Sequence, residues 1–489
     1  MIKDVEIERK SLWINLFIMI GIFIATFIFM LQSPLYLNGN SSTDSSVFQT
    51  IAMQMENELM PYKDSFDHKG PLIYLYNYWG NMIKPGRGIW IIEFLSVLTA
   101  FSFMYKIARL KCGKQQAFLI LMICATPLYT YFEQGNLSEE YALPFIALAI
   151  YIFADYFINK KISRVRLIIC GAGFGAVCML RINMVAVWIV FCCAVLLYEI
   201  ARKNLGEVLQ CLFWFLIGAG IVIIPIYWWL IANNALMDFI NDYFLFNKMY
   251  IQDTNRATLL NKYISFSNFL NNIYVLTVIG VACYLIKDKK LFHFAYLVYE
   301  VVCLVLICLS GQTYAHYGMV LVPMFVYPFA ILLSNQTVRK NSWILAFILY
   351  LSVSQVIPTW ISGIDKVAEF CLAENKISEQ TDLVGKVCSF IKENTKADDK
   401  IIVWGNWNII YVQSQRLPAS KYSYQFPIGK INEQIMNEFF EEINGNPPKA
   451  IVNARGMGIG KMEGFLNEHD YICMYEIEGI TVYMQDVGD

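Results

Sequence analysis

Long apolar segments recur along the first three quarters of the chain and determine its class. Each runs for roughly 14 to 21 residues, and most are long enough to cross about 30 Å of hydrocarbon at about 1.5 Å per residue. They predict a polytopic α-helical membrane protein with about eleven transmembrane helices. The segments are Leu12–Leu31, Ile89–Ile107, Ala117–Tyr131, Tyr141–Phe157, Leu167–Leu180, Met184–Leu197, Cys211–Ile231, Ile273–Ile286, Leu291–Leu309, Met319–Leu333 and Trp343–Pro358.

The polar connections between these segments predict the orientation, because Lys and Arg concentrate in cytoplasmic loops. Short basic connections alternate with other loops and share a side with the basic N-terminus. We therefore expect a cytoplasmic N-terminus and a long first outer loop over residues 32–88. The break at Arg181-Ile-Asn183 is either a tight outer turn or an interruption in one bent helix.

Beyond the last apolar segment the pattern changes to charged residues with short strand-like runs. Lys400–Trp404 and Ala450–Asn453 predict strands, Tyr471–Gln485 predicts a hairpin that turns near Glu478-Gly479, and Lys366–Asn394 has helical apolar spacing. This division predicts a transmembrane module over residues 1–361 and a small extracytoplasmic α/β domain over residues 362–489.

Composition supports the same class. Of 489 residues, 57% are hydrophobic and only 16% are charged, with a net charge of −1. We expect membrane lipids around the chain and no nucleic-acid partner. The sequence has no Walker or Rossmann glycine motif and no Cys-x-x-Cys or Cys/His metal spacing, so it requires no cofactor and leaves metal use undecided.

The densest charge cluster lies in the first outer loop, at Asp64-Ser-Phe-Asp67-His68-Lys69-Gly-Pro71. An ammonium beside a membrane suits the phosphate of a lipid-linked substrate, and a neighbouring histidine can share that anion. Lys69 and His68 are therefore candidate phosphate ligands. Asp67 is a candidate substrate ligand, or it pairs with Lys69 or orients His68.

Asp44, at the start of the same loop, has two interpretations that do not exclude each other. Ser41-Ser-Thr43-Asp44 resembles an N-cap for a helix over Ser45–Glu58, where a carboxylate would cap the helix and neutralise its positive end. The same carboxylate, held at the membrane surface, could act as the general base that deprotonates an acceptor hydroxyl.

Other outer segments supply four more candidates. Glu133 is favoured as a sugar or acceptor ligand with a catalytic role, and Glu139 follows it unless it only opens a helix capped by Ser138. Arg181 anchors a donor phosphate or snorkels to lipid headgroups. His316 binds phosphate or sugar hydroxyls, or is an interfacial histidine.

Aromatic residues in two outer regions have alternative roles. Those at helical spacing from Tyr243 to Tyr250 are membrane anchors or line a groove for the substrate. Those in Trp404–Trp407 and Tyr422–Tyr424 stack on sugars or belong to the core of the small domain.

The first-loop Asp followed by Pro-Tyr and then Asp-His-Lys-Gly-Pro-Leu resembles the GT-C superfamily of glycosyltransferases that use polyprenyl-phosphate sugars. It resembles especially the bacterial relatives of protein O-mannosyltransferases and the aminoarabinose transferases that modify lipid A. The resemblance extends from about Leu12 to Pro358. It implies that Asp44 is the catalytic base and that Lys69, with His68 beside it, contacts the donor phosphate.

The same resemblance extends to the segments that contain Glu133, Glu139, Arg181 and His316. Many members have an Asp-Glu pair at the first motif, whereas this chain has Asp44-Ser45, which removes the basis for inferring a metal ion. The implied function is an inverting membrane glycosyltransferase with a polyprenyl-phosphate sugar donor. Its acceptor is an extracytoplasmic polysaccharide, glycolipid or protein.

Two other classes of function stay open at this point. One is a transporter or flippase of a lipid-linked glycan, for which Glu300, in the middle of an apolar segment, is the clearest evidence. The other is a noncatalytic scaffold whose outer domain binds a wall polymer. The charged outer clusters argue against the scaffold.

Overall fold

The computed structural model describes most of the chain: residues 2–37, 41–254, 259–269, 272–288, 290–310, 313–334, 346, 350, 352–372, 379–454 and 458–485. The chain forms two compact units. Unit 1 contains Met1–Ser33, Trp90–Ile226 and Ala257–Leu372, and unit 2 contains Pro34–Ile89, Tyr227–Arg256 and Ala373–Asp489. Most of residues 32–88, which are predicted to form the first outer loop, therefore groups with the C-terminal segment, while the predicted domain boundary at residue 361 stays a prediction.

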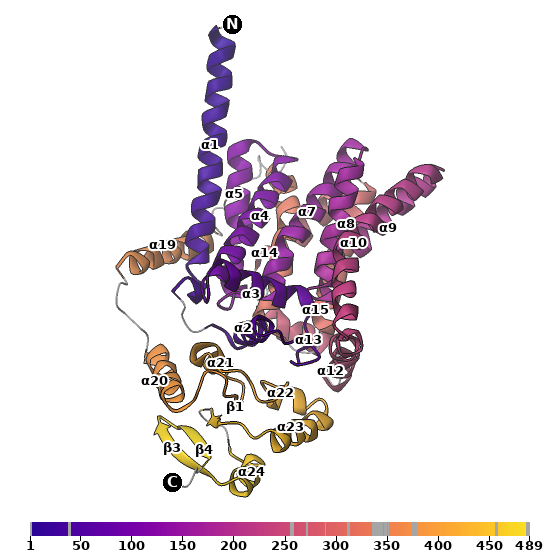
Figure 1. Cartoon of the computed structure of the whole chain (residues 1–489). Coiled ribbons are helices and arrows are strands. Elements are labelled where there is room, and N and C mark those ends of the chain that lie inside the picture. The colour runs from indigo at the N-terminus through magenta and orange to yellow at the C-terminus, as the bar shows by residue number, and fades with distance from the viewer. Residues whose placement is uncertain are drawn as a thin grey trace. The chain divides into compact units, whose positions relative to one another are not determined.

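Unit 1 is helical in all its described elements (Figure 1). They are α1 (Ile2–Met30), α4 (Gly88–Arg109), α5 (Lys114–Ala125), α6 (Leu128–Tyr131), α7 (Ser138–Asn159), α8 (Arg164–Cys178), η2 (Ile182–Met184), α9 (Ala186–Ala201), α10 (Leu205–Ala232), α13 (Leu259–Ser267), α14 (Asn272–Asp288), α15 (Leu291–Leu309), η4 (Ala315–Leu321), α16 (Val322–Ser334), η5 (Ser352–Val356) and α19 (Ile357–Leu372).

Six described segments are long and apolar enough to cross a membrane, and each coincides with a predicted span. They are Leu12–Met30, Gly88–Arg109, Ser138–Asn159, Leu205–Ala232, Leu291–Leu309 and Ala315–Ser334. Four other predicted spans fold as shorter helices, of 12 to 17 residues in α5, α8, α9 and α14. The predicted span Trp343–Pro358 lies partly outside the described residues, and its described end falls in η5 and the start of α19. The multi-pass helical architecture is confirmed.

The break at Arg181 is a turn and not a bend in one helix. The indole Nε1 of Trp188 in α9 donates to the carbonyl of Cys170 in α8 at 3.0 Å, which requires the chain to reverse direction between them. On its other side α8 packs closely on α10, because a Cβ at Gly171 would lie 2.0 Å from the carbonyl oxygen of Phe215. Small residues at such contacts let membrane helices approach closely.

Unit 2 combines helices with one small sheet. Its described elements are η1 (Pro34–Leu37), α2 (Thr43–Glu56), α3 (Pro71–Ile83), α11 (Leu236–Phe239), the π-helix η3 (Ile240–Leu245), α12 (Phe246–Thr254), α20 (Glu379–Asn394), β1 (Ile401–Trp404), α21 (Ile409–Ser414), α22 (Phe426–Gly429), α23 (Glu433–Gly445), β2 (Ala450–Asn453), α24 (Met462–Glu468), β3 (Tyr471–Ile477) and β4 (Ile480–Gln485).

The start of α2 corrects the predicted cap. The helix begins at Thr43, and the side chain of Ser42 accepts the hydrogen bond from the backbone N–H of Ser45. Asp44 therefore lies in the first turn and does not occupy the cap position. Its negative charge still faces the positive end of the helix. Ser42 has the same capping chemistry as Asp44, so spacing alone did not distinguish them.

The sheet of unit 2 has the strand order β1-β2-β4-β3 and agrees with the predicted strands. β1 pairs parallel with β2, and β4 pairs antiparallel with β2 and with β3. The β3–β4 hairpin turns at Glu478-Gly479, where both residues have positive φ. Two-residue hairpin turns favour this conformation, which explains why the turn was predictable.

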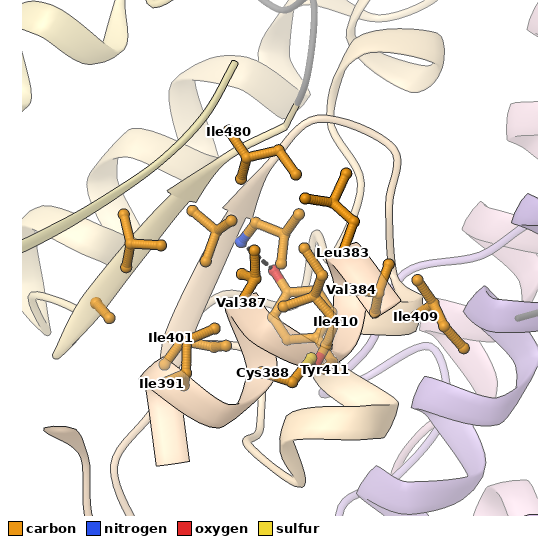
Figure 2. Packing of buried hydrophobic residues seen from close by; sticks show 14 of the residues in the cluster. Leu383, Val384, Val387, Cys388, Ile391, Ile401, Ile409, Ile410, Tyr411 and Ile480 are labelled. Carbon is orange, nitrogen blue, oxygen red and sulfur yellow. Dashed lines mark hydrogen bonds between the residues drawn. The ribbon is translucent and has the colours of Figure 1, made fainter. Parts of the chain in front are cut away.

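The core of this unit lies between α20, α21 and the sheet (Figure 2). Val384, Val387 and Ile391 of α20 are fully buried against strand residues such as Ile401 and Ile480. The Tyr411 hydroxyl accepts a hydrogen bond from the backbone N–H of Val403 at 2.7 Å. Met53 of α2 belongs to the same cluster, so α2 is anchored to the C-terminal fold by burial of apolar surface.

Candidate active site

In unit 2 the carboxylate of Asp67 is a buried acceptor for three hydrogen bonds. The Tyr74 hydroxyl donates to Oδ2 at 2.9 Å, the Tyr424 hydroxyl donates to Oδ1 at 2.8 Å, and the backbone N–H of His68 donates to Oδ1 at 2.7 Å. Burial raises the pKa of Asp67, although Lys69 and these donors oppose the shift. Asp67 therefore ties the first outer loop to the C-terminal segment.

Lys69 is nearly buried, and its ammonium lies beside the ring of His68. The Lys69 Nζ atom is 3.1 Å from His68 Nε2, and Lys69 is only 9% exposed. An ammonium group can only donate, so Nε2 accepts and the ring proton belongs on Nδ1. That Nδ1 is 3.6 Å from Asp67 Oδ1. The arrangement leaves the lysine as the cation of the group.

The chain after Lys69 adds a second feature suited to anions. The backbone at Lys69 is fixed because the Tyr62 hydroxyl donates to its carbonyl oxygen at 2.8 Å. Helix α3 then begins at Pro71, with Gly70 at the cap position and Pro71 in the first turn. A helix N-terminus carries partial positive charge, so Lys69 and the start of α3 act electrostatically in the same sense.

The aromatic segment after residue 242 packs on this loop. The His68 ring stacks on Tyr250 at 5.6 Å between ring centroids and lies 5.5 Å from Phe246. The amide Nδ2 of Asn247 donates to the His68 carbonyl at 2.8 Å. The sequence predicted that this segment anchors the chain in the membrane or lines a groove. It did not predict these contacts with His68. It holds His68 in place.

Asp44 acts electrostatically on Tyr424, the tyrosine that donates a hydrogen bond to Asp67. The Asp44 side chain is half-buried, and it adds to the effects of burial and of Asp67 that raise the pKa of Tyr424. Asp242 contributes in the same direction. Carboxyl groups from three parts of unit 2 thus raise the pKa of Tyr424, and its hydroxyl donates a hydrogen bond to Asp67.

Asp242 gives a prediction about pH. Its pKa is raised to about 8, mainly by burial. Lys421 partly offsets this shift, and the negative charges of Asp238, Asp67 and Glu438 add to it. An unfolded aspartate ionises near pH 3.9, so stability falls as pH rises from about 4 to about 8. We expect Asp242→Asn to raise the melting temperature at pH 8 and change it little at pH 4.

Differential scanning fluorimetry of the detergent-solubilised protein at several pH values measures this difference. The exposed Glu441, changed to Gln, serves as the control and should show the same small effect at every pH. An equal change for Asp242→Asn at pH 4 and pH 8 would contradict the assigned ionisation.

In unit 1 a tight loop places Glu133 against His316. Glu133, Gln134, Gly135 and Asn136 all have positive φ. Such backbone is costly for residues other than glycine and is found at functional sites. The Glu133 Oε2 atom lies 2.5 Å from His316 Nδ1, and the Glu133 side chain is 40% exposed whereas that of His316 is 8% exposed. The pair therefore reaches the surface at its carboxylate.

Arg181 and Glu139 form a second acid–base pair in unit 1. A guanidinium nitrogen of Arg181 binds the Glu139 carboxylate, and another donates to the Tyr317 hydroxyl at 2.9 Å. The guanidinium also lies 4.4 Å from the Tyr317 ring centroid. Burial lowers the pKa of Arg181, but Tyr317 and Glu139 outweigh burial and raise it overall. Glu139 lies in the first turn of α7, as predicted, but Ser138 is not its cap, since Leu137 occupies that position.

Two further carboxylates hold the Glu133 loop and were missed as site residues. The backbone N–H of Asn136 donates to Glu93 at 2.6 Å and to Glu140 at 2.8 Å. The Ser33 hydroxyl donates to Glu93 at 2.9 Å. Glu93 lies within an apolar segment, and only the tertiary fold brings it to the loop. Glu140 could have been proposed as a site residue, because it directly follows the candidate Glu139 in the sequence.

Gly135 shows how tightly this loop is packed. Its φ is +80°, and a Cβ there would lie 2.5 Å from both Glu93 Oε1 and the Phe132 ring. We expect Gly135→Ala to lower the melting temperature and to reduce any activity that depends on Glu133. Gly206→Ala is the matched control, because a Cβ there meets no atom within 4 Å. A Gly135→Ala protein as stable as Gly206→Ala would contradict the packing described.

Metal ligation has no geometric support in the described part of the chain, where no three His, Cys, Asp or Glu side chains gather closely enough to hold an ion. The acidic groups at Asp67, Glu133 and Glu139 each have a protein partner instead.

The family model of the competence-induced protein Ccs4 N-terminal domain matches residues 3–344. The chain belongs to this family. The match covers both the first outer loop and the segments that contain Glu133, Arg181 and His316. No curated protein sequence matches this Ccs4 family chain.

Solved structures with the same fold are more distant in sequence. ArnT from Cupriavidus metallidurans bound to undecaprenyl phosphate matches with a TM-score of 0.65 and 12% identity, over 96% of this chain and 97% of that one. Its apo state matches with a TM-score of 0.64 and 11% identity, over 97% and 98%. Archaeal AglB from Archaeoglobus fulgidus, in complex with an inhibitory peptide and a dolichol-phosphate, matches with a TM-score of 0.51 and 12% identity, over 97% and 75%. These proteins belong to the GT-C superfamily, so the predicted GT-C fold is confirmed for this Ccs4 family chain.

The structure gathers the eight predicted site residues into two groups. Unit 2 holds Asp44, Asp67, His68 and Lys69, and unit 1 holds Glu133, Glu139, Arg181 and His316. Their roles stay predictions. Sequence reasoning missed Tyr74 and Tyr317. Trp404, Tyr422 and Tyr424 are buried, which favours the predicted core role over sugar stacking.

Proposed function

We propose that the chain is a membrane glycosyltransferase that transfers a sugar from a polyprenyl-phosphate donor to an extracytoplasmic acceptor. The observation that carries the proposal is Lys69, a nearly buried cation held at the N-terminus of α3 within a GT-C fold. The fold neighbours support the donor class, because ArnT is bound to undecaprenyl phosphate and AglB to a dolichol-phosphate. The acceptor is a cell-surface polysaccharide, a glycolipid or a protein.

The proposed reaction is a displacement at the anomeric carbon with inversion, as the GT-C resemblance implies. The acceptor oxygen attacks that carbon while Asp44 takes the acceptor proton. The bond between the anomeric carbon and the donor phosphate oxygen breaks, and its electron pair moves to the phosphate. Lys69, held by His68, stabilises this charge, which is often the largest single contribution to catalysis. The products are a new glycosidic bond and polyprenyl phosphate.

The unit 1 residues have a supporting part in this proposal. Arg181 and His316 already have acidic partners, so a donor phosphate would share them with Glu139 and Glu133. Glu133, the more exposed of the two acids, is the proposed ligand of sugar or acceptor. We further propose about eleven spans, a cytoplasmic N-terminus and an extracytoplasmic C-terminal domain, from the apolar segments and the positive-inside pattern.

The alternative is a flippase of a lipid-linked glycan. Glu300 in α15 favours it, because this acid is buried and neither carboxylate oxygen has a hydrogen-bond partner among the described residues. Unpaired acids within membrane helices mark ion or substrate pathways. A single buried acid is weak support for a transport pathway. The Glu133–His316 and Arg181–Glu139 pairs give stronger support for an enzyme.

Transfer from a panel of radiolabelled polyprenyl-phosphate sugars tests the proposal. Purified protein in liposomes is incubated with each donor and with a membrane extract as acceptor. Label on an acceptor only with the wild-type protein, and not with Asp44→Asn, is the expected result. The absence of transfer from every donor would overturn the proposal.

A further inference from the structure

Unit 2 contains a cavity of about 810 Å³, and Lys69 is not among the residues that line it. Its walls come from α2, the end of α3 and the turn after it, α20, α21 and β3. The residues that line it are Gln49, Met53, Glu56, Asn81, Pro85, Gly86, Gly385, Lys386, Ser389, Phe390, Lys392, Glu393, Val412, Gln413, Gln415 and Tyr475. Its volume falls in the range of about 300–1,000 Å³ that is typical of small-molecule sites.

The floor of the cavity is polar and fixed. Gln49 is only 4% exposed, and its amide Nε2 donates to Ser41 Oγ at 2.8 Å and to Ser45 Oγ at 3.0 Å. These bonds orient the amide. An amide held in this way keeps its Oε1 atom in a fixed direction, and an amide oxygen can accept a hydrogen bond from a ligand hydroxyl. Asn81 is also held in place, because its Nδ2 donates to Glu56 Oε1 at 2.6 Å and its Oδ1 accepts from the backbone N–H of Gly86 at 3.4 Å.

One wall is an aromatic platform. The rings of Phe390 and Tyr475 lie parallel, 4.6 Å apart at 12°, and both side chains are half-buried. They join α20 to β3 beside the cavity. A flat apolar surface next to oriented amides suits a ligand with one apolar face and a rim of hydroxyl groups.

The charges around the cavity balance. Glu56 and Glu393 are opposed by Lys386 and Lys392, so the lining has no net charge and gives no preference for an anion or a cation. This differs from the Lys69 group, whose cation suits a phosphate. An uncharged, hydroxyl-rich ligand fits the amides, the aromatic platform and the charge balance together.

We propose that this cavity binds a neutral oligosaccharide, as a glycan site separate from the donor site. If the proposed transfer is correct, the bound glycan is part of the acceptor, and this part of the inference rests on the proposed function. Binding itself does not depend on transfer, so the two can be tested apart.

Gly385 offers a test that need not disturb folding. It lies within α20 and lines the cavity, and a Cβ there meets no atom within 4 Å. Gly385→Trp places a large side chain in the open space and removes a glycine from a helix, where glycine costs about 0.5–1 kcal/mol relative to alanine. Gly464→Trp in α24 is the matched control, because Gly464 also faces open space but does not line the cavity.

The experiment measures fluorescence polarisation of labelled maltohexaose, mannohexaose and chitohexaose with the full-length protein in nanodiscs. At least one should bind with a millimolar or lower Kd, and a heparin hexasaccharide should bind at least tenfold more weakly. Gly385→Trp should raise the Kd at least tenfold, while Gly464→Trp leaves it within twofold.

The proposal is overturned if none of the three neutral hexasaccharides binds, if Gly385→Trp binds as well as the wild type, or if the heparin fragment binds more tightly. A protein that transfers sugar but binds no hexasaccharide would lack the site and retain the proposed function. A protein that binds but transfers from no donor would retain the site and lose the proposed function.

Discussion

Asp44→Asn is expected to lower sugar transfer by about 10²–10⁴-fold while the protein stays folded, which is the range for loss of a general base. The amide has nearly the shape of the carboxylate but cannot accept the acceptor proton. Asp44 lies in the first turn of α2, which is capped by Ser42, so loss of its charge costs the helix only about 0.3–1 kcal/mol. Initial rates at saturating donor and the melting temperature measure the two effects separately.

The control for this substitution is Glu58→Gln. Glu58 is an exposed carboxylate in the same outer loop, just after α2 ends, so its loss changes the net charge by the same amount. It should leave transfer within twofold of the wild type. Wild-type turnover by Asp44→Asn would remove Asp44 as the base, and an equal loss in both variants would assign the effect to net charge.

Lys69→Ala is expected to reduce kcat/KM for the polyprenyl-phosphate donor by about 10²–10³-fold, a range typical for loss of one group that stabilises developing negative charge. The Lys69 ammonium is nearly buried and is held beside His68, so an exposed lysine elsewhere in the loop should not substitute for it. The acceptor KM should change little, because the proposed contact is with the donor phosphate. Steady-state rates with donor and acceptor varied in turn separate these effects.

Lys63→Ala is the matched control. Lys63 lies six residues earlier in the same loop and is exposed. Its removal should leave donor use unchanged. Equal losses for the two lysines would show that the loop attracts the donor only by general charge, and an unchanged kcat/KM for Lys69→Ala would contradict the proposed phosphate contact.

Local features were predictable because their signals are local. The periodicity of Lys400–Trp404 and Ala450–Asn453 predicted β1 and β2, and the Glu-Gly pair predicted the hairpin turn. Apolar length predicted each of the six long spans. Composition cannot decide where a short apolar helix ends. Helices α8, α9 and α14 are slightly longer than the segments predicted for them, and the predicted span Ala117–Tyr131 divides into α5 and α6.

The grouping of the site residues was not predictable, because it depends on contacts between distant parts of the chain. Asp67 and Tyr424 are 357 residues apart and meet through one hydrogen bond. Glu133 and His316 are 183 residues apart. The residue types at these positions indicated chemistry, but no pattern in a single sequence specifies which of them are neighbours.

The fate of a doubly labelled donor tests the central claim most directly. A polyprenyl-phosphate sugar with one label in the sugar and another in the lipid is placed in liposomes that contain the wild-type protein and an acceptor extract. We predict that sugar label moves to the acceptor while an equal amount of polyprenyl phosphate is released, and that Asp44→Asn releases neither. Movement of the intact doubly labelled lipid across the bilayer without release would contradict glycosyl transfer and favour the flippase.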